Sequence, residues 1–574
     1  MTAVRSILET REKRSASLVL QNFSELLPFA AELGVKYQLR VLSHCVVSQL
    51  RSASRSGSLS PEDWSRVFEL IESMLSLVES HPSLSLEFYN VYEAIRGANT
   101  LEADLQDLAA SDSPARIEGD LAQYVAQLAA DYVRSQQQSD AHSTAYVARL
   151  RDEVRLEGLA ARVQRYYAAQ PRLCVQMALL RVRLLFFSLL SCLTPSHYLR
   201  EPVYRALYST CRPAQPPADL FATVRAACGL VYREGIAAQR LEAALYEIIH
   251  LSVNGRFVAA RDLMLMAHVQ ERIVRAEDEQ RLLFNRAMMH LGVAAFCQGN
   301  MVYAHNCLDD LVNLGTRSNQ LRALVAQGSD AQDEETHALH ERWSVPMHQW
   351  VNLELVEVCY LLSCVFMDVA SMVADRSNIY KISAFFKRYY DRYRRHVFLR
   401  PDTDSLRVLA AYEAILKGDW RQAVAISRGI DAWRFLPAEM RENVLAMLEG
   451  KTQTLALQAF LLERGTCYQS LSLEGLCEMF SLPADRVRAE VNRLLLQGLV
   501  SAFWNEDATM LQFVETLPSR VEMLTLQMAE KVNELEDANK RMREEKREDG
   551  YKGRRPFNIL SQRTTGGRQR QTGR

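Results

Sequence analysis

Hydrophobic residues recur every three or four positions along most of the chain, which is the spacing of a helix that buries one face. The pattern predicts a helical pair within residues 16–50 and a helix that opens at Ser60-Pro61-Glu62-Asp63. Serine is a preferred N-cap, and proline fits the first helical position, whose N–H has no partner inside the helix. Another helix is expected to begin near Ile117. Polar connections are expected at residues 52–60, 109–115 and 136–143.

The segment Val175–Leu193 is the most apolar run and has nearly the length of a membrane span. Arg181 and Arg183 lie near its middle, and charged side chains there are costly in a bilayer. We therefore expect a buried helix. The N-terminus carries too much charge for a secretory signal, so we expect a cytoplasmic protein without a membrane partner.

Three helix–turn–helix units share the turn pattern Gly-x-apolar-x-x-Ala, at residues 255–260, 299–304 and 418–423. The glycine ends one helix in a backbone conformation that other residues resist, and the alanine lets the next helix approach closely. Such units cannot bury their faces alone, so they stack into an α-solenoid of the tetratricopeptide kind. The repeat fits a binding scaffold, the alternative is merely a helical domain, and both predict no active site.

The pattern changes in residues 455–514, which predict a winged helix. Two helical segments are followed by a third that Pro483 opens and Gly498 ends. Two runs typical of strands come next, Leu499–Trp504 and Thr509–Val514, joined by a polar turn. If these strands leave an edge, a partner can extend the sheet, with Phe503 and Leu511 as candidate contact residues.

The third helix of a winged helix reads DNA in many proteins, and here it carries Arg486, Arg488 and Arg493. However, Glu490 lies among these arginines, and no asparagine or glutamine is well placed for base contacts. A packing or partner role is therefore favoured over nucleic-acid recognition.

A coiled-coil seam follows the winged helix, with apolar residues at alternating spacings of four and three. It predicts a helix that binds partner helices, since the chain offers nothing further to cover the stripe. The seam consists of Leu517, Val521, Leu524, Met528, Leu535, Ala538 and Met542, with Lys531 in the remaining position. Residues 550–574 then contain one lysine, six arginines and no acidic residue, and predict a disordered basic tail.

Composition agrees with a mainly helical protein. The chain has 574 residues, 48% of them hydrophobic, with only 23 glycines and 16 prolines. A formal net charge of −1 argues against a surface that coats nucleic acid. The 11 cysteines include no C-x-x-C pair, so we expect free and mostly buried thiols.

The sequence contains none of the glycine-rich phosphate loops, zinc-protease motifs or nucleophile elbows that mark common enzymes. His337 and His340 lie near His348 and two glutamates, but a solvated linker explains them better than a metal site. Glu354 and Glu357 lie on a helix and need no catalytic role. We expect no catalytic residue, no metal and no cofactor.

One stretch, residues 385–396, interleaves tyrosines with basic residues, as RNA-contacting surfaces do. The alternative is a helix that buries its aromatic side chains and points its arginines outward. The candidate RNA contacts are Lys387, Arg388, Arg392, Arg394 and Arg395 in this stretch, and Arg554, Arg555, Arg568 and Arg570 in the tail.

Helical repeats followed by a winged helix resemble the PCI module of the proteasome lid, the COP9 signalosome and translation initiation factor 3. Several strings make the resemblance closer, to the c-subunit family of eukaryotic translation initiation factor 3. They are Ala260-Arg261-Asp262-Leu263-Met264-Leu265-Met266-Ala267-His268, Phe284-Asn285-Arg286-Ala287-Met288, Asn352-Leu353-Glu354-Leu355-Val356-Glu357, Lys417-Gly418-Asp419-Trp420 and Leu526-Gln527-Met528-Ala529-Glu530-Lys531. The similarity is strongest over 240–535 and weaker but colinear over 16–240.

The resemblance implies a non-catalytic scaffold that binds the small (40S) ribosomal subunit and promotes preinitiation-complex assembly and mRNA recruitment. It also implies contacts with other subunits of the factor: chiefly its a-subunit, through a PCI–PCI sheet, and the subunits of a helical bundle. Ribosomal RNA or mRNA would be further partners. The implied layout is helical regions at 1–115 and 116–236, repeats at 237–345, a PCI domain at 346–516, a bundle helix at 517–546 and a disordered tail at 547–574.

Family members usually carry a long acidic, serine-rich N-terminal extension that contacts initiation factors 1 and 5. Here the family-like helices begin close to Met1, so the resemblance does not support that contact. Two other functions remain open: a PCI scaffold of a proteasome-lid or signalosome-like complex, and a nucleic-acid-binding regulator. The basic tail and the string at 260–268 speak against the first, and Glu490 with the neutral net charge speaks against the second.

Overall fold

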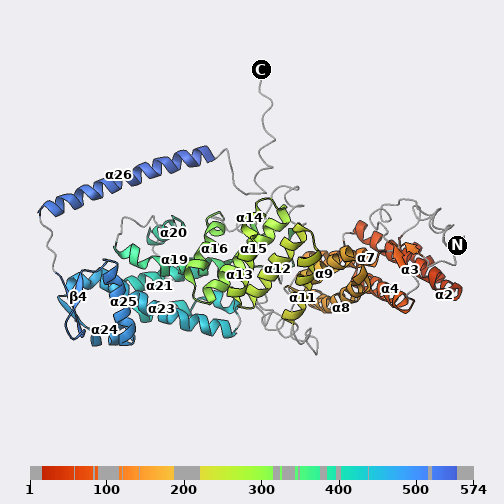
Figure 1. Cartoon of the computed structure of the whole chain (residues 1–574), viewed down its shortest axis with the longest axis horizontal. Helices are drawn as coiled ribbons and strands as arrows, with labels where there is room; N and C mark the ends of the chain where they lie inside the picture. The colour runs from red at the N-terminus through yellow and green to blue at the C-terminus, as the bar shows by residue number, and fades with distance from the viewer. Residues whose placement is uncertain are drawn as a thin grey trace, which may run out of the picture. The chain divides into compact units, whose positions relative to one another are not determined.

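The computed structural model is mainly α-helical, and its described residues belong to two compact units. The first unit is built from residues 1–291 and 341–351, the second from 292–340 and 352–574. Figure 1 gives the order of the elements along the chain. The structure describes residues 16–56, 58–81, 85–87, 116–118, 120–140, 143–186, 220–314, 324–325, 343–346, 349–374, 384–395, 403–436, 438–514 and 520–551.

The first unit begins with the predicted helical pair. Its helices are α2 (Ala16–Leu33), α3 (Val35–Ser56), α4 (Pro61–Ser80), α7 (Leu121–Gln138), α8 (Thr144–Tyr166), α9 (Pro171–Leu185), α11 (Leu220–Glu234), α12 (Ala237–Val253), α13 (Phe257–Met266), α14 (Val269–Ile273) and most of α15 (Asp278–Cys297), with the 3-10 turn η1 (Tyr167–Ala169). The N-cap at Ser60 is confirmed, because its hydroxyl accepts a hydrogen bond from the Asp63 amide at 3.1 Å.

Two expectations in this unit were wrong. Residues 116–118 form strand β2 (Arg116–Glu118), which pairs in parallel with β1 (Ser85–Glu87), so the helix expected near Ile117 begins at Leu121 instead. Asp120 starts it by accepting a hydrogen bond from the Ala122 amide at 2.9 Å. The polar connections are also shorter than expected. Helix α3 runs to Ser56 and α7 to Gln138, because Arg, Ala and Gln are good helix formers.

The apolar run at 175–193 is a buried helix as far as it is described. Helix α9 buries Val175, Ala178 and Val182, while residues 187–193 lie outside the described part. Arg181 pairs with Glu157 at 2.7 Å, and Arg183 pairs with Glu242 at 2.6 Å, so both charges are neutralised locally. Among the described residues, no helix combines the length and the apolar character needed to cross a membrane.

The three repeat turns have the predicted geometry. Gly255, Gly299 and Gly418 have φ values of 73°, 81° and 82°, which side chains disfavour. Each turn closes with the same pair of backbone bonds; at the second, Asn300 donates to the Ala295 carbonyl and Gly299 to the Phe296 carbonyl. The three alanines, Ala260, Ala304 and Ala423, are fully buried where the paired helices meet.

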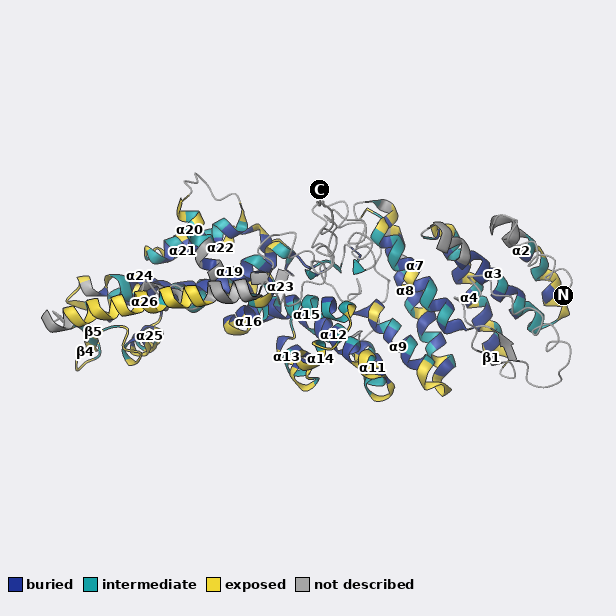
Figure 2. Cartoon of the chain, turned by 90° about the horizontal axis from the view of Figure 1, so that it is seen from above, coloured by how far each residue is buried: buried dark blue, intermediate teal, exposed yellow. Residues whose placement is uncertain are grey.

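The second unit is built around α19 (Leu353–Ala374), which is buried on most sides between Leu355 and Val365 (Figure 2). It packs against α16, α21 and α23. The other helices of this unit are α16 (Met301–Leu314), α20 (Ala384–Arg395), α21 (Asp404–Leu416), α22 (Trp420–Arg428), α23 (Ala438–Arg464), α24 (Leu473–Phe480), α25 (Ala484–Leu496) and α26 (Arg520–Tyr551), with 3-10 turns η4 (Asp431–Phe435) and η5 (Gly465–Cys467).

The end of α23, with α24, α25 and a small antiparallel sheet, has the element order of a winged helix. The sheet has three strands rather than two, in the order β3-β5-β4: β3 (Ser470–Ser472), β5 (Met510–Phe513) and β4 (Ala502–Trp504). Strand β3 was not predicted, because three residues are too short to show alternation. Pro483 is the N-cap of α25 rather than its first residue, and Gly498, with φ of 68°, ends the helix as predicted.

The cysteines that the structure describes are free thiols. Five of them are buried: Cys45, Cys174, Cys228, Cys359 and Cys364. Burial raises the pKa of the Cys45 thiol to about 12, which keeps it protonated and unreactive at neutral pH.

Replacing Gly418 by alanine is expected to lower the free energy of unfolding by about 1–2 kcal/mol, because alanine disfavours the positive φ that the turn requires. The added Cβ meets no neighbouring atom, so a steric clash does not contribute. Gly450→Ala is the matched control. It lies inside helix α23, where alanine is favoured over glycine by up to about 1 kcal/mol. Urea denaturation followed by tryptophan fluorescence should give opposite signs for the two variants. Equal effects would contradict the turn geometry.

Candidate interaction surfaces

Strand β4 lies at one edge of the winged-helix sheet and carries the predicted contact residue Phe503, which is 51% exposed. Trp504 on the same strand is held in place by Asn492, to which its indole donates at 2.8 Å. Leu511 is on the central strand β5 and is 0% exposed, so it belongs to the core and drops out of the candidate contact surface. In the sequence, its apolar side chain is compatible with a core position or with a contact surface, and only the strand order distinguishes the two.

Helix α25 packs against α23 on the side that carries Glu490. The Glu490 carboxylate accepts a hydrogen bond from Gln458 at 2.9 Å and pairs with Arg493 at 3.1 Å. Val487, Val491 and Leu494 form its buried face. Part of the polar surface that DNA recognition would need is therefore engaged within the chain.

Helix α26 exposes the predicted seam to solvent. Leu524, Met528, Leu535 and Met542 are 56%, 70%, 66% and 54% exposed. Apart from Asp537, every side chain from 524 to 543 is exposed (Figure 2). Leu517 lies outside the described residues, and Val521 lies in the helix without a described side chain. Leu526 and Val532, which lie outside the predicted seam, are exposed as well.

Helix α20 places Arg392, Arg394 and Arg395 in solvent, while Phe386 is buried and stacks on Tyr390 with ring centroids 6.4 Å apart. Both rings also meet Tyr412 edge-on. The aromatic residues thus hold the helix to α21. The side chains of Lys387 and Arg388 are not described, and the tail arginines Arg554, Arg555, Arg568 and Arg570 lie outside the described residues.

A partly buried carboxyl group, that of Glu357, connects α19 with α20 and α21. Burial raises the pKa of the Glu357 carboxyl, while hydrogen bonds with Ser405 and Tyr389 act in the opposite direction. This explains Glu357 as an internal anchor of α20 and α21. Among the residues that the structure describes, no group of three potential ligands could hold a metal ion, and His337, His340 and His348 lie outside them.

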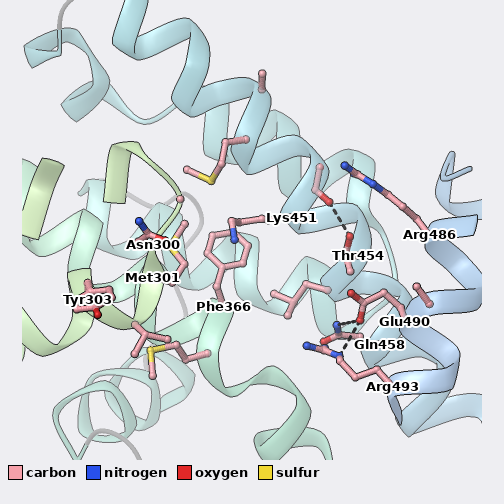
Figure 3. A pocket seen from close by; sticks show the side chains of 18 residues that line it. Asn300, Met301, Tyr303, Phe366, Lys451, Thr454, Gln458, Arg486, Glu490 and Arg493 are labelled. Atoms are coloured by element: carbon pink, nitrogen blue, oxygen red, sulfur yellow. Dashed lines mark hydrogen bonds and ion pairs between the residues drawn. The ribbon is translucent and has the colours of Figure 1, made fainter. Parts of the chain in front are cut away.

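A groove that the sequence did not predict lies within the second unit, here called the α23–α25 groove, with a cavity of about 970 Å³. Four segments far apart in the sequence line it: the turn before α16 with the first residues of α16, the end of the buried part of α19, the middle of α23 and one face of α25. Figure 3 shows Lys451 from α23, Arg486 from α25, and Glu490 with Gln458 and Arg493 around this space. No local motif signals it, because it exists only after the repeat and the winged helix pack together.

Comparison with known proteins agrees with the resemblance in the sequence. The family described as "Eukaryotic translation initiation factor 3 subunit 8 N-terminus" matches residues 1–379. The C-subunit of eukaryotic translation initiation factor 3 from Yarrowia lipolytica is 27% identical over 560 residues, covering 94% of this chain and 66% of that protein. The same protein of Bombyx mori is 27% identical, covering 93% of this chain and 59% of that protein. The same subunit of Schizosaccharomyces pombe is 27% identical, covering 95% of this chain and 60% of that protein.

The chain thus spans between half and two thirds of the length of the curated relatives that it matches. The family match covers more than half of the chain, and the relatives carry the corresponding name over most of its length. The chain belongs to the C-subunit family of eukaryotic translation initiation factor 3, which the family description calls subunit 8.

Proposed function

We propose that this chain is a non-catalytic scaffold subunit of the eukaryotic translation initiation factor 3 complex. In this role it acts in the cytoplasm, binds the small (40S) ribosomal subunit, and promotes preinitiation-complex assembly and mRNA recruitment. The observation that carries the proposal is helix α26, whose apolar stripe is exposed along its described length. A scaffold needs such surfaces for other chains, and family membership names the complex in which they would be used.

Three surfaces serve the assembly in this proposal. The PCI domain, at 346–516, offers the β4 edge to a neighbouring PCI protein, chiefly the a-subunit of the factor, by sheet extension. Helix α26 enters a bundle with helices of other subunits. The exposed arginines of α20 supply auxiliary contacts to ribosomal RNA or mRNA. A role in a proteasome-lid or signalosome-like complex would use the same surfaces, but the names of the relatives favour translation initiation.

For the bundle, we expect Leu524→Asp combined with Leu535→Asp to abolish assembly with the helical-bundle subunits. Each leucine contributes about 1.5–3 kcal/mol to binding when its side chain is fully buried. An aspartate at the same position would instead have to be desolvated, which is unfavourable. Co-purification of the tagged chain with the other subunits measures the effect. The matched control is Leu526→Asp with Asn533→Asp, which adds the same charge on the same helix but off the predicted seam. Assembly of the seam variant at the control's level would refute the bundle helix.

For the sheet edge, Phe503→Asp is expected to release the neighbouring PCI protein while the chain stays folded, because Phe503 is half exposed and points away from the core. Leu511→Asp is the contrasting variant. It places a charge at a fully buried position and should lower the melting temperature of the chain itself. Pull-down with circular dichroism distinguishes the two. If Phe503→Asp still retains its partner, sheet extension at β4 is not the contact.

For RNA contact, we expect replacing Arg392, Arg394 and Arg395 by alanine to flatten the salt dependence of ribosome or RNA binding. Each lost phosphate contact changes the slope of log K against log salt by about 0.7–0.9. A charge-matched control replaces three exposed arginines elsewhere: Arg240 on α12, Arg272 on α14 and Arg275 in the turn that follows α14. Equal salt-dependence slopes for the two triple variants would show that α20 makes no specific RNA contact. If deleting residues 550–574 reduces the slope more than the α20 variant does, the contact is assigned to the tail.

A further inference from the structure

The α23–α25 groove contains two cationic side chains without a partner among the described residues. Lys451 projects from α23 and Arg486 from α25, and neither side chain has a hydrogen bond or an ion pair there (Figure 3). The only acidic residue that lines the groove, Glu490, is already paired with Arg493 and bonded to Gln458. The groove therefore carries positive charge that the described part of the chain does not neutralise.

The rest of the lining is largely apolar. Met301, Phe366, Met367, Met447 and Leu455 line it from three helices. Methionine side chains adapt to irregular shapes, so such a wall can take an apolar side chain of a ligand without one fixed form. At the rim, Val302 and Tyr303 are exposed although α16 buries the residues on either side of them, Met301 and Ala304.

These two properties together restrict the ligand. A nucleic-acid strand is held by a row of cations that follows its phosphates and by aromatic faces that stack on its bases. The groove has only two cations without a partner among the described residues, Lys451 and Arg486, set among methionine and leucine side chains, and the aromatic residues of its lining are Tyr303 and Phe366. A polypeptide that carries a carboxylate next to apolar side chains matches both the charge and the apolar wall.

We propose that the α23–α25 groove binds an acidic, apolar segment of a partner polypeptide. A carboxylate of that segment pairs with Lys451 and Arg486, and a neighbouring apolar side chain packs against Met447 and Phe366. This site is separate from the sheet edge and from α26, and it does not require the chain to act in translation. It adds a peptide-recognition site at the junction of the repeat and the winged helix.

The proposal can be tested with the full-length chain and random peptides displayed on phage. Selection on the wild-type chain, with counter-selection on Lys451→Glu/Arg486→Glu, should enrich peptides with Asp or Glu beside large apolar residues. A synthetic copy of an enriched peptide should bind the double variant at least about tenfold more weakly in fluorescence anisotropy, as expected for loss of close charge pairs. The control Arg441→Glu/Arg464→Glu reverses two exposed charges on α23 outside the groove and should bind like wild type.

Further measurements keep the result decisive. Circular dichroism of both double variants should match wild type, and Met447→Asp should weaken the same peptide through the apolar wall. Enrichment of no peptide, or of peptides without acidic residues, overturns the proposal. Binding of an oligouridylate that depends on Lys451 and Arg486, and that displaces the peptide, would assign the groove to RNA instead.

Discussion

Paired helices of the repeats approach closely because the residues at their crossings carry little or no side chain. A Cβ placed on Gly292 would come within 2.6 Å of Leu308, so α15 and α16 can pack as they do only with glycine at this position. Ala304, one turn into α16, is buried at the same crossing. The glycine turn at 299 then reverses the chain within two residues. Small residues at these positions thus determine the crossing angle and the separation of the paired helices, against which the following helices pack.

The packing of the winged helix also depends on a repeat turn and on a residue without a side chain. The third repeat turn reaches it directly, since the Trp420 indole donates to the Met479 carbonyl at 2.9 Å. On the other side, Gly465 lets Phe513 of the sheet approach, because a Cβ there would lie 2.8 Å from the ring. With α24, α25 and the sheet held against α23 in this way, Lys451 and Arg486 come to lie across one groove. A cationic site therefore arises from packing rather than from a local motif.

Much of this fold could be predicted from spacing alone, because helix periodicity, caps and glycine turns are local properties. The turns at 255, 299 and 418, the cap at Ser60 and, over residues 175–185, the buried helix are confirmed for this reason. The expectations that failed depend on pairing between distant segments. Strands β1, β2 and β3 have three residues each and do not lie within a longer apolar run, unlike the equally short β4, which lies within the apolar run 499–504. Leu511 is compatible with a surface or a core position until the strand order is known. The α23–α25 groove combines four such segments, so no single stretch could have indicated it.

In helix α26, by contrast, the sequence favours a helix although the apolar face of that helix is exposed to solvent. Its sequence is rich in Glu, Lys, Leu, Met and Ala, which favour helix, and Lys540 pairs with Glu536 one turn apart at 2.9 Å. An exposed pair of this kind is screened by solvent and adds little. Leu524, Met528 and Leu535 nevertheless remain in water along one stripe. Most helical stability in proteins comes from burying such a face, and the described residues leave this face of α26 uncovered, which is the physical reason for proposing that it binds helices of other subunits.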